Sequence, residues 1–139
     1  MLFKLFNVLF CLVFILFAAF QYNDPDPYLW MPIYLYAAVL CALAVKYTFN
    51  PVAYLTGLLF YLVYAGYLFF TQDGVLDWIN QHQSENIAQT MKATRPWIED
   101  TREFFGLIII ITVLLINFFY LRNRLKSQIT GRQTVKTAT

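Results

Sequence analysis

The sequence predicts an all-α membrane protein with four transmembrane helices and a short helical outer loop between spans three and four. Hydrophobic residues make up 60% of the 139 residues and charged residues 13%, against roughly 45–50% and about 25% in soluble proteins. The apolar residues form four long runs, and most charged residues lie between or after them. A bilayer can cover that much apolar surface, whereas a soluble domain of this length cannot.

The four apolar runs have the length of membrane-spanning helices, because a helix needs about 20 residues to cross roughly 30 Å of hydrocarbon. The predicted spans cover about residues 2–20, 28–46, 51–71 and 103–121. They form a single four-helix transmembrane domain over residues 1–126. Residues 127–139 are polar and lightly basic, so we expect a disordered cytoplasmic tail there.

Proline marks the start of two spans. Asp26-Pro27 and Asn50-Pro51 each place a good N-cap residue before a proline, which suits the first helical position because its missing N–H would have no helical partner there. We therefore expect helices to begin at these two dipeptides.

Small and polar aromatic residues inside the spans predict helix contacts. Ala38 and Ala42 are spaced so that a neighbouring backbone can approach closely. Tyr54, Tyr61 and Tyr64 share one face of the third span. They would line a ligand path or donate their hydroxyls to neighbouring helices, and we favour the second interpretation.

The outer loop between spans three and four carries two helix signals. Val75, Leu76, Trp78 and Ile79 predict a short amphipathic helix at the membrane interface. Pro96 is expected to open another helix that continues into the fourth span.

The charged residues predict the orientation of the chain. Seven of the ten basic residues lie at the N-terminus, between spans two and three, or in the C-terminal tail: Lys4, Lys46, Arg122, Arg124, Lys126, Arg132 and Lys136. All eight acidic residues lie on the opposite side. Basic residues mark the cytoplasmic face, so we expect both termini in the cytoplasm. The short loops favour the inner membrane of a bacterial cell.

Two polar clusters on the outer side are the candidate binding site. The first contains Asn23, Asp24, Asp26 and Trp30, and the second contains Glu99, Arg102 and Glu103. A structural interpretation explains both, because Asp26 can cap a helix, Asp24 can pair with Arg102, and Arg102 can pair with Glu99 at a spacing of three.

A functional interpretation of the same carboxylates is the binding of a cation or a polar ligand, since oxygen ligands hold hard cations. The sequence offers no convincing nucleophile and base, so we assign no catalytic residue and no enzymatic activity. It offers no metal-ligand spacing, no phosphate-binding loop and no basic stripe for nucleic acid. We therefore assign no metal site, no cofactor and no nucleic-acid partner.

At these clusters the sequence resembles the transmembrane protein 220 family. The matching pieces are Gln21 to Asp26 (QYNDPD), Trp30, Tyr34, Arg102-Glu103 and Gly106-Leu107-Ile108-Ile109. The similarity extends over about residues 10–120, and the outer loop and the C-terminal tail do not correspond. The resemblance implies a small polytopic membrane protein, and it implies no activity.

Three functions stay open. The leading hypothesis is a non-enzymatic accessory or scaffold subunit that contacts lipid and either other membrane subunits or copies of itself. The alternative is a channel-like or carrier-like protein that binds a ligand or cation through its outer carboxylates. The weakest hypothesis is an enzyme that acts on lipid at the outer interface. Its minimum requirement is that replacement of Asp24 or Glu103 abolishes turnover.

Overall fold

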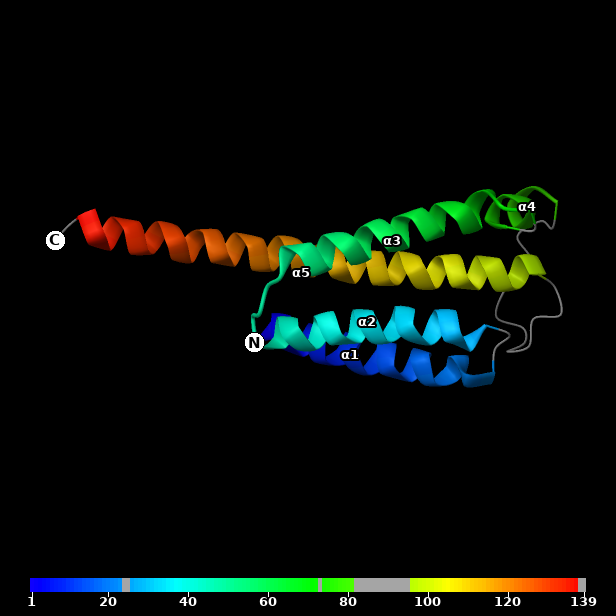
Figure 1. Ribbon diagram of the computed structural model, residues 1–139, viewed down its shortest axis with the longest axis horizontal. Coiled ribbons are helices and arrows are strands. Elements are labelled where there is room, and N and C mark those ends of the chain that lie inside the picture. The colour runs from blue at the N-terminus through cyan, green and yellow to red at the C-terminus, as the bar shows by residue number, and fades with distance from the viewer. Residues whose placement is uncertain (24–25, 73, 82–95, 138–139) are drawn as a thin grey trace. The chain divides into compact units, whose positions relative to one another are not determined.

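The computed structural model is helical throughout the residues that it describes, which are 1–23, 26–72, 74–81 and 96–137, apart from short turns (Figure 1). Its elements are α1 (Leu2–Phe20), the 3-10 turn η1 (Gln21–Asn23), α2 (Pro27–Val45), α3 (Pro51–Phe70), α4 (Val75–Asn80) and α5 (Pro96–Thr137). The helices α1, α2, α3 and α5 are long and apolar enough to cross a membrane. The predicted fold class is confirmed, including the short helix between the third and fourth spans.

Helix α5 extends beyond the predicted fourth span at both ends. It begins at Pro96, as predicted, and its 42 residues reach Thr137 as one uninterrupted helix, drawn yellow to red in Figure 1. The structure is therefore helical over 127–137, where the sequence predicts disorder. Propagation from an existing helix avoids the cost of nucleation. The hydroxyls of Ser127 and Thr130 also donate to carbonyls four residues earlier, at 3.2 and 3.1 Å.

The chain divides into two units. Met1–Leu55 and Val113–Thr139 form the first, and Thr56–Thr112 forms the second, so α3 and α5 contribute to both. In the first unit α1 packs along α2. The buried small residues of α2 include Ala37, Ala38, Cys41 and Ala44. Ala42 is exposed, so the predicted pair Ala38 and Ala42 does not form one contact face.

Tyrosine hydroxyls join helices within the first unit. The buried Tyr54 donates from its hydroxyl to the carbonyl of Leu40, at 3.1 Å. The Tyr36 hydroxyl donates in the other direction, from α2 to the carbonyl of Ala53 in α3, at 2.9 Å. For Tyr54, the interpretation as a helix-joining hydroxyl is confirmed.

The turn between α2 and α3 satisfies carbonyl groups at the end of α2. The N–H groups of Tyr47 and Thr48 donate to the carbonyls of Ala44 and Leu43, at 2.9 and 3.0 Å. This pair of bonds is the Schellman motif, whose residue after the C-cap takes a left-handed conformation and is usually glycine. Here that residue is Tyr47, with φ 56°.

The second unit is joined by aromatic contacts. Phe69 of α3 lies against Phe104 of α5, with ring centroids 5.6 Å apart. Trp78 of α4 meets Phe105 edge-on at 6.3 Å. These contacts attach α3 and the short helix α4 to the first turns of α5, where two of the predicted site carboxylates lie.

Candidate functional site

Asp26 occupies the N-cap position of α2, as predicted, and Pro27 follows it as the first helical residue. The carbonyl of Asp26 accepts from the N–H groups of Leu29 and Trp30, at 3.0 and 3.4 Å. Its side chain makes no capping hydrogen bond to the described N–H groups of the helix. The expectation that the Asp26 carboxylate is consumed in capping is therefore wrong, although the helix begins where the dipeptide predicts.

Trp30 lies one turn into α2 and is fully buried. Its ring centroid is 6.0 Å from that of Tyr34, and Phe17 of α1 meets Tyr34 edge-on at 5.5 Å. Trp30 therefore belongs to the aromatic core between α1 and α2. The side chain of Asn23 and the whole of Asp24, two further predicted site residues, lie outside the described part of the chain.

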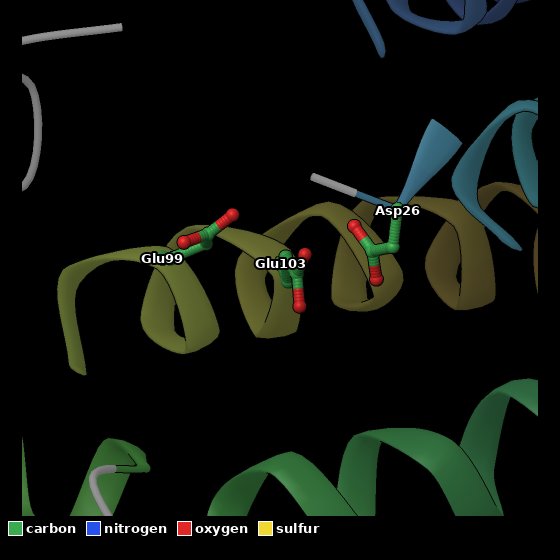
Figure 2. A group of neighbouring side chains, drawn as sticks. All are labelled: Asp26, Glu99 and Glu103. Atoms are coloured by element: carbon green, nitrogen blue, oxygen red, sulfur yellow. The ribbon is translucent and has the colours of Figure 1, made fainter. Parts of the chain in front are cut away.

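Glu99 and Glu103 lie one turn apart near the start of α5, on the same face of the helix (Figure 2). Both side chains are half-buried, and a carboxylate oxygen of one lies within 4.8 Å of a carboxylate oxygen of the other. Arg102, also half-buried, is the residue immediately before Glu103. Two like charges at this spacing repel each other, and a cation between them would remove that repulsion.

The structure thus brings together residues of each predicted cluster within its own unit. In the first unit, Asp26 lies one helical turn before Trp30. In the second, Glu99 and Glu103 present adjacent oxygens. The chemistry available to either set is binding through oxygen ligands.

A buried amide pair in the first unit was not predicted. Asn117 of α5 donates from Nδ2 to Oδ1 of Asn7 in α1, at 2.6 Å, and Asn7 donates from Nδ2 to the carbonyl of Phe3, at 3.0 Å. The same Asn117 nitrogen lies 3.9 Å from Cys41 Sγ of α2. Both asparagines are fully buried.

The sequence contains a signal for this pair. Asn7 is the one amide between residues 2 and 20, and Asn117 is the one amide between residues 104 and 121. Polar residues in apolar helices often join helices by hydrogen bonds. The two asparagines are 110 positions apart, so the sequence alone does not show that their side chains form a hydrogen bond.

Comparison with known proteins identifies the family. The model of transmembrane family 220 matches residues 13–119, which is most of the chain and includes both polar clusters. No curated protein and no solved structure matches the chain. The four apolar helices and the extent of this match together show that the chain is a membrane protein that belongs to the transmembrane protein 220 family.

Proposed function

We propose that this protein is a non-catalytic accessory or scaffold subunit of a larger membrane assembly, and that α1 is its docking helix. The observation that carries this proposal is a leucine stripe on α1. Its members are exposed by 50–81% and recur at alternating spacings of three and four: Leu2, Leu5, Leu9, Leu12 and Leu16.

The spacing of the stripe matters more than its apolarity. Lipid tails are as apolar as leucine, so helices associate in membranes through close packing. Residues that alternate at three and four positions form a continuous seam that interdigitates with a second helix. Exposed leucines at the same spacing also occur on α3, so the extent of burial distinguishes the two helices. Only 17% of the most apolar segment of α1 is buried, against 33% for the segment that contains α3 and 44% for α2, so α1 has the larger exposed face.

The polar groups inside the first unit support a scaffold. The hydroxyls of Tyr36 and Tyr54 and the Nδ2 of Asn117 all donate to other helices of this unit. Such bonds hold helices in one register. A rigid set of helices with an apolar outer face suits a subunit that positions partners.

The test is purification of the tagged full-length protein from its native membrane in a mild detergent, followed by mass spectrometry of what co-elutes. We expect a stoichiometric membrane partner with the wild type, and its loss with the triple variant L5A/L9A/L12A. The matched control L55A/L59A/L62A removes three exposed leucines of the same spacing from α3, and it should retain the partner. Migration of the wild type as a lone monomer would refute the proposal.

A second candidate function is cation or polar-ligand binding by the outer carboxylates. The close oxygens of Glu99 and Glu103 support it, as does an Asp26 side chain that makes no cap bond. Alternating connections between four spans would place the starts of α2 and α5 on the same side of the membrane. Asn23, Asp24, Asp26, Glu99 and Glu103 would therefore all face the outer side of the membrane, as would Trp30 and Arg102 beside them.

Thermal stability across Mg²⁺, Ca²⁺ and Mn²⁺ tests this second candidate. A divalent cation should raise the Tm of the wild type but not of E103Q. The matched control is D77N, which removes an acid that accepts a hydrogen bond from Gln81, at 3.1 Å. An unchanged wild-type Tm with all three cations would rule against cation binding at these residues.

We also propose that the basic ends of the helices face the cytoplasm of a bacterial cell and the acidic ends face outward. The segregation of Lys and Arg supports this orientation. Reporter fusions at both termini, active only in the cytoplasm or only in the periplasm, would test it. A periplasmic signal at either end would overturn the proposed orientation.

A further inference from the structure

Tyr47 occupies a position that usually requires glycine. It follows the C-cap of α2 with φ 56°, in the Schellman turn. A side chain at this position is unfavourable because the left-handed conformation brings Cβ close to the backbone. A large residue persists there when its surroundings determine its conformation, so the contacts of the Tyr47 ring are informative.

Two cations lie against the Tyr47 ring. The Arg124 guanidinium carbon is 3.5 Å from the ring centroid, and Lys4 Nζ is 5.1 Å from it. Phe3 lies near the same ring at 5.9 Å and stacks on Tyr120 at 3.8 Å, which helps to hold α1 and α5 beside the turn. We name Lys4, Tyr47 and Arg124 the Tyr47 cation site.

The two positive charges of this site have no acidic neighbour in the sequence. No Asp or Glu occurs in residues 1–23, 27–72 or 104–139. Over the described residues, neither Lys4 nor Arg124 forms an ion pair or donates a hydrogen bond. The aromatic ring offsets part of the repulsion between them, and an anion bound to both would offset more.

The arrangement leaves hydrogen-bond donors available to such an anion. A guanidinium that stacks by its face keeps its N–H groups in the plane of the group, where they match the oxygens of a phosphate. The Lys4 ammonium carries three further donors. Both side chains are exposed.

The surroundings favour a lipid over a free anion. Beside Arg124, Leu125 is 40% exposed, and Tyr120, whose ring stacks on that of Phe3, is 43% exposed. An anion at Arg124 therefore sits beside apolar surface that acyl chains can cover. The site also lies where α1 begins, α2 ends and α5 leaves its apolar run, which is the level of the head groups.

We propose that the Tyr47 cation site binds the phosphate-bearing head group of an anionic phospholipid in the adjacent leaflet. Clusters of Lys and Arg beside membrane helices bind such lipids through charge. Here the aromatic ring organises two of the cations in a defined place.

Native mass spectrometry of the full-length protein with phosphatidylglycerol or phosphatidylcholine measures the affinity of the first bound lipid. We expect the wild type to bind phosphatidylglycerol more tightly than phosphatidylcholine. K4Q/R124Q should weaken the binding of phosphatidylglycerol by about ten-fold or more, since each cation near a membrane contributes about five-fold. The matched control R122Q/K126Q removes the same charge from exposed positions of α5. It should weaken binding clearly less than K4Q/R124Q does, because only Lys4 and Arg124 lie against the Tyr47 ring.

A second variant, Y47L, retains every charge and an apolar side chain. It should weaken phosphatidylglycerol binding several-fold if the ring organises the cations. Equal losses in the two double variants, or unchanged binding in Y47L, would reduce the site to general charge attraction and overturn the proposal. Displacement of phosphatidylglycerol by millimolar inorganic phosphate would assign the site to a free anion and overturn it as well.

Discussion

The two turns that join helices in the first unit use the same kind of dipeptide differently. At Asn50-Pro51, the Oδ1 of Asn50 accepts from the N–H groups of Val52 and Ala53, at 3.1 and 3.3 Å, and so caps α3. At Asp26-Pro27, the carboxylate makes no capping bond. The dipeptide therefore specifies where a helix begins, but it does not specify whether the capping side chain is consumed.

The difference extends to the two ends of the first unit. Around the Asn50 turn, polar side chains join elements to one another, as Asn117 does with Asn7. At the Asp26 turn, the carboxylate is left for other interactions. At the Asn50 end, polar side chains stabilise the contacts between helices. At the Asp26 end, a carboxylate can still bind a ligand. Four sets of substitutions test this contrast.

The largest loss of stability is expected at the buried amides. N7A would leave the Nδ2 of Asn117 with only the weak approach to Cys41, and we expect a loss of about 1–2 kcal/mol in unfolding free energy in detergent. The double variant N7A/N117A should lose less than the sum of the two single variants, because the partner is removed as well. Additive losses would show that the bond contributes no coupling.

The next largest effect is expected at Asn50. N50A removes the acceptor for two N–H groups of α3, and it should lower the unfolding free energy by about 1 kcal/mol. N50D keeps a capping oxygen and serves as the control. A loss in N50D equal to that in N50A would show that the capping oxygen of residue 50 does not stabilise α3.

At Tyr47 the informative quantity is the difference between two variants. Y47A and Y47G both remove the ring, but only Y47G removes the penalty of a side chain at positive φ. We expect Y47G to be more stable than Y47A by about 1 kcal/mol. Equal stability would contradict a left-handed conformation at this residue.

The smallest effect is expected at Asp26. D26A should change the unfolding free energy by no more than about 0.5 kcal/mol, because the side chain makes no cap bond. Measured beside N50A under the same conditions, it tests the contrast directly. A loss at Asp26 as large as that at Asn50 would remove the contrast between the turns.

The positions of the candidate residues in the helices were predicted in part. The sequence identified the positions of Glu99 and Glu103 on one helix face, because a spacing of four on a helix is local information. It also predicted the helix start at Asp26. It did not show that Trp30 is a core residue, since burial depends on which helices surround α2. The tail likewise lacked a predictive signal, because its polar composition is compatible with both a helix extension and disorder.

The sequence by itself determined the apolar runs, their helical state and the three helix starts at Pro27, Pro51 and Pro96. These features follow from the cost of exposing backbone polar groups to lipid, which leaves helices as the solution for isolated apolar runs. Only the tertiary structure decided that Asn7 meets Asn117, that two cations share the ring of Tyr47, and that the Asp26 side chain makes no capping bond. Each of these depends on the rotation and register of packed helices, because many rotations bury similar apolar area and only specific packing distinguishes them.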